Sequence, residues 1–140
     1  MQPVAHPSTN PFERFRDQQG AILLDGGLAT SLEALGYPLD HELWSAKILL
    51  DAPDAVRRVH TDFLQAGADC ITTATYQASI PGFTAHGLTP DRALEVLDRA
   101  VGLAIEARDA FWSDAENLEQ RLQPLVAASV GPYGAFLAVG

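Results

Sequence analysis

Short apolar runs alternate along the chain with longer segments whose apolar residues recur every three or four positions. The runs are "AILLDGG" at 21–27, "ADCITTATYQAS" at 68–79 and "PLVAASVGPYG" at 124–134. Runs of this length and β-branched character predict strands, and the segments between them have the periodicity of amphipathic helices. Strands that alternate with helices predict βαβ units and a parallel sheet.

Helix signals fill the first gap between the predicted strands. One helix is expected around residues 43–50, and a second begins within 51–67. Asp51 is a candidate N-cap for the second helix, and Pro53 stands in its first turn, where a missing N–H costs nothing. Gly67 stands where a C-terminal glycine ends such a helix.

A loop is expected at 80–88, and a longer helix then begins at Thr89-Pro90. Residues 113–123 either extend this helix or form a polar turn. The helical spacing predicts a buried stripe made of Leu94, Leu97, Val101, Ala104 and Ile105. Near the other end of the chain, residues 12–20 predict one or two helical turns that end at Gly20. We divide the chain into an N-terminal tail, 1–17, and one folded unit, 18–140.

Composition narrows the class of protein. Nearly half of the residues are apolar (47%), which is enough for a sizeable core, while the formal charge of −9 argues against nucleic acid or an anionic membrane as partner. The single cysteine, Cys70, excludes an internal disulfide framework. Because no apolar run is long enough to span a bilayer and the N-terminus lacks a signal-peptide pattern, we expect a soluble, cytoplasmic protein.

Each predicted strand turns polar or glycine-rich at its carboxyl end: Asp25-Gly26-Gly27, then Thr72–Gln77, then Ser129–Gly134. In parallel α/β sheets, ligands bind off the carboxyl ends of the strands. Strand alternation would place Thr72 and Tyr76 on one face, pointing into the site, and Thr73 and Thr75 on the other. The sequence therefore predicts a ligand site at this end of the sheet.

Each candidate residue also has a purely structural explanation. Asp25 either caps the following turn or accepts a hydrogen bond from a ligand ammonium group, with the glycine amides nearby for a ligand carboxylate. Thr72 either satisfies a backbone carbonyl or binds ligand, and Tyr76 either packs or forms a site wall. Trp44 is either a core residue or an aromatic wall for a sulfonium or quaternary ammonium cation. Cys70 is expected to be a buried small side chain.

The three histidines that follow the N-terminal tail, His41, His60 and His86, have no metal-like spacing and are expected at surface or helix positions. The motif "GPYG" lacks the further glycines and the lysine of a phosphate loop, so it is weak support for phosphate binding.

Three separated blocks together resemble one known family. They are "LLDGGLATSLEALGYPL", "ELWSAKILLDAPDAVRRVHTDFLQAGADCITTATYQAS" and "VAASVGPYGAFLA", and they cover about residues 18–138. They closely resemble the zinc-dependent homocysteine S-methyltransferases, in particular the branch that uses S-methylmethionine or S-adenosylmethionine. The resemblance implies a (β/α)8 barrel in which a zinc-bound thiol attacks the methyl group of a sulfonium donor.

The resemblance also implies roles for individual residues. Asp25 and the Gly26-Gly27 backbone would hold the amino-acid part of homocysteine, and Thr72 would line the same pocket. Tyr76 and Trp44 would line the donor side. The zinc of the family is held by cysteines on a late strand and near the C-terminus, and Cys70 matches none of them. No catalytic residue and no metal ligand is therefore expected in this chain, and zinc is not expected to bind it alone.

The resemblance places the chain as the truncated N-terminal portion of such a barrel, with about three of its strands. We expect this portion to be inactive by itself and to self-associate through open sheet edges. One alternative is a non-catalytic remnant or association module that retains half of an amino-acid pocket. A second alternative is a different parallel α/β enzyme that shares the barrel.

Overall fold

The structure, a computed structural model, describes the backbone of residues 10–38 and 44–132, and the side chains of all of these except 44–46. The element order is α1 (Glu13–Gln19), α2 (Leu28–Ala34), α3 (Trp44–Asp51), α4 (Pro53–Gln65), β1 (Cys70–Thr72), α5 (Ile80–Ala85), α6 (Pro90–Trp112), α7 (Ala115–Gln120) and β2 (Leu125–Ala127). In these ranges, no helix is both long enough and apolar enough to cross a bilayer.

A small parallel sheet lies at the centre, which confirms the α/β class. β1 pairs with β2 in parallel, from Cys70 opposite Leu125 to Thr72 opposite Ala127. The first predicted strand is wrong as a regular strand, because it forms only a single parallel bridge, Leu24 to Cys70. The backbone N–H of Asp25 donates to the Cys70 carbonyl over 2.9 Å, so this segment still runs along the free side of β1.

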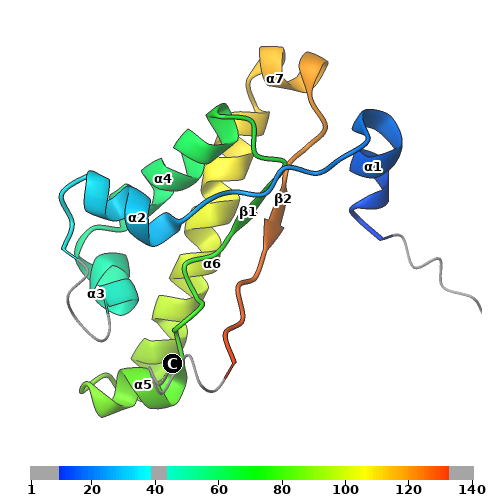
Figure 1. Cartoon of the computed structure of the whole chain (residues 1–140). Coiled ribbons are helices and arrows are strands. Elements are labelled where there is room, and N and C mark those ends of the chain that lie inside the picture. The colour runs from blue at the N-terminus through cyan, green and yellow to red at the C-terminus, as the bar shows by residue number, and fades with distance from the viewer. Residues whose placement is uncertain (1–9, 39–43, 133–140) are drawn as a thin grey trace, which may run out of the picture.

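The helices lie along the strands and at their two ends. Figure 1 shows α4 and α6 running side by side next to the sheet, with α1 and α7 near the end where β2 begins and α5 near the opposite end. Because parallel strands share one direction, all of their carboxyl ends face the α5 end. That end is where the sequence predicts the ligand site.

Local sequence explains the ends of the two long helices. As predicted, α6 begins after Thr89, whose hydroxyl accepts from the Arg92 N–H over 3.2 Å, and Gly67 follows α4 with a left-handed φ of 113°. The predicted Asp51 cap is wrong. Asp51 ends α3, and α4 is capped by Ala52 without a side-chain hydrogen bond.

The predicted buried stripe of α6 is wrong for three of its five residues. Leu94, Val101 and Ile105 are 48%, 37% and 38% exposed. The buried face consists mainly of small residues: Ala93, Val96, Ala100, Leu103, Ala104, Ala107 and Phe111. Small side chains let the facing helix approach closely, so helix packing selected the alanine-rich face over the more hydrophobic one.

Two further segments differ from the sequence expectation. The loop expected at 80–88 contains helix α5, whose first turn is capped by the Ser79 hydroxyl, which accepts from the Gly82 N–H over 3.1 Å. Helix α2 was not predicted, because its N-cap is Gly27 and no side chain caps it. The turns ending at Gly20 are confirmed as α1. The division into 1–17 and 18–140 stays a prediction.

Arg121 connects the elements at the beginnings of the strands. Its guanidinium donates to the carbonyls of Leu64 and Gly67, over 2.7 and 2.9 Å, and also to the Ala68 carbonyl. These carbonyls lie at the end of α4 and in the turn before β1, and the Leu64 carbonyl also accepts from the Gly67 N–H over 3.1 Å. The guanidinium also lies 5.3 Å from the centre of the Phe111 ring.

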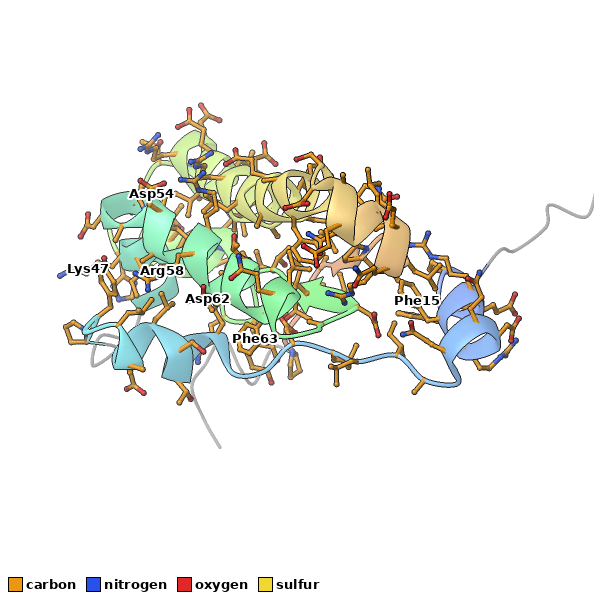
Figure 2. All side chains as sticks on the ribbon, turned by 90° about the horizontal axis from the view of Figure 1, so that it is seen from above. Phe15, Lys47, Asp54, Arg58, Asp62 and Phe63 are labelled. Carbon is orange, nitrogen blue, oxygen red and sulfur yellow. The ribbon has the colours of Figure 1, made fainter. Side chains whose placement is uncertain are left out.

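Asp69 completes this arrangement, which we call the arginine clamp (Arg121 and Asp69). Its carboxylate is 3.3 Å from the Arg121 guanidinium, and it accepts from the Leu23 N–H and the Gln19 side chain over 2.9 and 2.6 Å. The side chains of Asp69 and Arg121 are only 8% and 20% exposed. The clamp therefore joins α1, the Leu23 segment, α4, β1 and the end of α7. Figure 2 shows Phe15 reaching from α1 toward the rest of the chain, where it is fully buried.

Candidate functional site

A hollow of about 300 Å³ lies beyond the carboxyl ends of the strands. Its wall consists of residues 26–29, residues 72–74 with Tyr76 and Gln77, and Ser129. We call this hollow the pocket. Four of the predicted site residues, Gly26, Gly27, Thr72 and Tyr76, thus line one cavity although they come from segments almost fifty positions apart in the sequence.

Asp25 lies directly behind the pocket wall and is bonded to Thr72. The Thr72 N–H donates to Oδ2 of Asp25 over 2.8 Å, and the Thr72 hydroxyl lies 3.1 Å from both carboxylate oxygens. Thr72 therefore supplies two donors, while a carboxylate has about four acceptor positions. Asp25 is half-buried and retains acceptor capacity for a further donor.

This geometry also decides between the open interpretations of the two residues. Asp25 does not cap the next helix, because the N-cap of α2 is Gly27 and no side-chain cap bond is formed there. Thr72 does not satisfy a backbone carbonyl, since its hydroxyl donates to Asp25. Their predicted roles as substrate contacts stay predictions.

The glycine at position 26 leaves room for an aromatic ring below the pocket. A Cβ at Gly26 would lie 3.0 Å from Cε1 of Phe63, closer than carbon atoms approach without something shifting. Figure 2 shows Phe63 on α4, directed at the segment that leads into α2. A residue other than glycine would displace either the ring or the backbone that lines the pocket.

The hydroxyls after β1 do not follow strand alternation. β1 ends at Thr72 and residues 74–77 form a turn, so Thr73 lines the pocket as well, although alternation placed it on the opposite face. Thr73 is 3% exposed. Its hydroxyl accepts from the Ser129 N–H over 3.0 Å and lies 2.7 Å from the Thr75 hydroxyl, which donates to the Ser129 carbonyl over 2.7 Å.

Tyr76 and Trp44 differ in what the structure says of them. Tyr76 is 56% exposed, so packing in the core does not explain it, and its side chain borders the pocket. The backbone of Trp44 begins α3, but its side chain lies outside the described residues. Of the two residues predicted for the aromatic wall, Tyr76 is the one whose side chain the structure describes.

Cys70 is confirmed as a buried small side chain, 1% exposed. Burial raises the pKa of its thiol, and the nearby Asp25 carboxylate raises this pKa further. A thiol with a raised pKa is a poor metal ligand, because the thiolate is the form that binds. Within the described ranges no group of three or more His, Cys, Asp or Glu residues could hold a metal ion. Zinc thus does not fit the residues that the structure describes.

The remaining histidines are placed as follows. His60 is on a helix, as expected, but it is fully buried, and its ring nitrogens have no hydrogen-bond partner among the described residues. Burial lowers the pKa of His60 to about 4. His86 is exposed, with a ring nitrogen 3.0 Å from the Gly82 carbonyl, and His41 lies outside the described residues.

Sequence reasoning missed Leu28 and Ala29 as parts of the pocket wall, whereas Gln77 ends the predicted polar segment Thr72–Gln77. Leu28 and Ala29 open α2, so they were missed together with that helix. The signal that could have revealed it is the apolar spacing of Leu28, Leu32 and Leu35 directly after the glycine pair.

Comparison with known proteins identifies relatives across almost the whole chain. The family model described as homocysteine S-methyltransferase matches residues 22–140. Homocysteine S-methyltransferase YbgG of Bacillus subtilis is 49% identical over 131 residues, which are 94% of this chain and 42% of that protein. Homocysteine S-methyltransferase of Escherichia coli is 48% identical over 131 residues, 94% of this chain and 41% of that protein.

A solved structure shares both sequence and fold. The metallated form of the homocysteine methyltransferase MmuM from Escherichia coli superimposes with a TM-score of 0.86 at 48% identity, over 94% of this chain and 44% of that one. The chain thus spans less than half the length of the relatives that it matches. On the family match and these identities, the chain belongs to the homocysteine S-methyltransferase family.

Proposed function

We propose that this chain forms part of an enzyme that transfers a methyl group from a sulfonium donor, S-methylmethionine or S-adenosylmethionine, to the thiol of homocysteine, giving methionine. The observation that carries the proposal is the family match over residues 22–140, with relatives named for this activity at 48–49% identity. We do not favour the alternative of a non-catalytic remnant, because the relatives that match almost the whole chain are named for the methyltransferase activity.

The pocket binds the amino-acid part of homocysteine in this proposal. The Asp25 carboxylate accepts from the substrate ammonium group, a charge-assisted bond that gains strength from partial burial. The two bonds from Thr72 hold the carboxylate in place before the substrate arrives. The backbone amides of Gly26 and Gly27, which carry no side chains to block approach, face the substrate carboxylate.

Tyr76 supplies an aromatic face near the donor, with Trp44 as its proposed second wall. A ring attracts a sulfonium cation through its negative face, and this attraction weakens once the methyl group has left and the donor sulfur is neutral. The aromatic wall therefore favours the charged donor over the neutral product. S-methylmethionine and S-adenosylmethionine both carry this charge.

Zinc enters only as a family property. The solved relative is described as metallated, and the resemblance places the metal ligands on cysteines that this chain lacks. Since the described residues do not offer a site, we propose that the chain alone binds no zinc and transfers no methyl group. We also propose that the rest of a barrel covers the two open edges of the sheet, and that the isolated chain self-associates through these edges. We further propose that the protein is cytoplasmic.

Two measurements test the proposed function. Calorimetric titration of the chain with L-homocysteine should show binding, and Asp25→Ala should weaken it at least about tenfold, since it removes a charge-assisted bond. Methionine formation from homocysteine and S-methylmethionine should be undetectable for the chain alone with zinc. Methionine formation should appear when the part of the Escherichia coli relative that this chain does not match is added as a second polypeptide.

The control for Asp25 is Asp54→Ala, which removes an exposed carboxylate on the outer face of α4 (Figure 2) and should leave binding unchanged. Equal binding by Asp25→Ala and the unsubstituted chain would refute the assigned pocket. Methionine formation by the chain alone would refute the claim that it is inactive.

A further inference from the structure

Two threonine hydroxyls engage both backbone groups of Ser129, beyond the end of β2. The Ser129 N–H donates to the Thr73 hydroxyl and the Thr75 hydroxyl donates to the Ser129 carbonyl, over 3.0 and 2.7 Å. Because the Thr75 proton is used on that carbonyl, the 2.7 Å contact between the two hydroxyls must use the proton of Thr73. The three residues form a closed hydrogen-bond cycle, which we call the hydroxyl ring (Thr73, Thr75 and Ser129).

The hydroxyl ring stands where sheet pairing stops. The last backbone bond between the two segments runs from the Thr73 N–H to the Ala127 carbonyl, over 3.0 Å. Directly afterwards, the chain following β1 turns on itself, with the Thr75 N–H donating to the Thr73 carbonyl over 2.8 Å. The backbone of the turn therefore does not bond to Ser129. The hydroxyls of Thr73 and Thr75 bond to the Ser129 N–H and carbonyl instead, as a neighbouring strand would.

All three hydrogen bonds donate in the same direction around the cycle, from Ser129 to Thr73, from Thr73 to Thr75 and from Thr75 back to Ser129. Hydrogen bonds linked in this way polarise one another, and each is stronger in a buried position than in water. Thr73 is 3% exposed, and Thr75 and Ser129 are half-buried, so the ring is partly shielded from solvent. Ser129 and Thr73 both line the pocket, which means that the ring fixes two parts of its wall relative to each other.

We propose that Thr73 and Thr75 are positioning residues of the pocket: through the hydroxyl ring they hold Ser129 in the wall against which the substrate binds. The inference rests on the proposed function for the identity of that substrate, homocysteine. It explains why a short strand continues into a run of threonines. The hydroxyls of Thr73 and Thr75 build the wall, and that of Thr72 orients Asp25.

Threonine-to-valine variants test the hydroxyl ring, because valine keeps the branched shape and removes the hydroxyl. Thr73→Val removes the acceptor of the Ser129 N–H, so exchange of this amide with solvent, followed by NMR on the full chain, should accelerate about tenfold. Thr75→Val removes the donor to the Ser129 carbonyl and the acceptor of the Thr73 hydroxyl, but it keeps the acceptor of the Ser129 N–H, so it should accelerate the exchange less. Both variants should weaken L-homocysteine binding about tenfold.

Serine variants and a distant valine variant serve as controls. Thr73→Ser and Thr75→Ser keep the hydroxyls and should stay within about twofold of the unsubstituted chain in both readouts. Thr61→Val removes a hydroxyl that bonds the Arg57 carbonyl on α4 and should change neither readout. A general loss of stability would affect the serine and valine variants alike, whereas a lost hydroxyl affects only the valine variants.

The outcomes separate this inference from the proposed function. Unchanged Ser129 exchange in Thr73→Val, or unchanged homocysteine affinity in both valine variants, would overturn the inference while the proposed substrate stands. If the unsubstituted chain binds no homocysteine, the proposed substrate is wrong, and Ser129 exchange alone decides whether the hydroxyl ring holds the wall.

Discussion

The two ends of the small sheet are held together by different chemistry. At the beginnings of the strands, one guanidinium and one carboxylate, both largely buried, bind backbone groups from several elements. At the carboxyl ends, neutral threonine hydroxyls bond to one another, to Ser129 and to the half-buried Asp25. At the first end the polar groups are bonded within the fold, whereas at the second the Asp25 carboxylate keeps acceptor capacity next to a pocket. The difference separates the end that stabilises the fold from the proposed binding end.

Replacing Arg121 should show the largest effect on stability. Arg121→Met removes a partner of a buried carboxylate and takes away the bonds that the guanidinium donates to the Gly67 and Ala68 carbonyls. We expect a loss of about 3–5 kcal/mol in the free energy of unfolding, measured by urea denaturation. Arg57→Met, which removes an exposed pair with Asp54, should cost about 0.5 kcal/mol or less. Equal losses for the two variants would show that the arginine clamp does not stabilise the sheet.

Acid should destabilise the chain through His60, which lies between the two ends on α4. Burial lowers the pKa of His60 to about 4 from 6.5. Between these values the unfolded chain binds a proton that the folded chain does not, so stability is full above pH 6.5 and falls as the pH drops toward 4. The loss should approach about 3 kcal/mol.

A variant assigns this pH dependence to one side chain. His60→Leu should flatten the stability profile between pH 6.5 and 4, since no group at position 60 then titrates, whereas His86→Gln at an exposed position should retain the slope. Denaturation midpoints collected across this range are the measurement. A slope that survives in His60→Leu would assign the acid sensitivity to other groups.

Removing one hydroxyl at the binding end should cost the least stability. Thr72→Val deletes the side-chain bond to Asp25 but keeps the backbone bond, so we expect a loss of about 1 kcal/mol in unfolding free energy. The same change should weaken homocysteine binding about tenfold, because Asp25 is then held by one bond only. Thermal melts and calorimetric titration on the same preparations compare the two effects. A stability loss as large as that of Arg121→Met would remove the contrast between the ends.

The sequence predicted the arrangement of elements better than their details. Parallel pairing and the polar ends of strands follow from patterns in neighbouring residues, and they located Thr72, Tyr76 and the glycine pair around one pocket. The buried face of α6 could not be predicted in this way. Alanines such as Ala100 and Ala107 carry little hydrophobic signal, and their burial depends on how closely α4 approaches. Thr73 was placed on the wrong face, because alternation was extended past the point where the strand stops.

The long-range bonds of Arg121 have a consequence for how the chain folds. Its partners Leu64, Gly67, Ala68 and Asp69 precede it by 57, 54, 53 and 52 positions. A bond between groups so far apart requires a large loop to close first, which makes it a late and slow event. During synthesis, the Gly67 and Ala68 carbonyls after α4 would stay hydrated, and the connection from α4 to β1 would gain these bonds only when position 121 emerges.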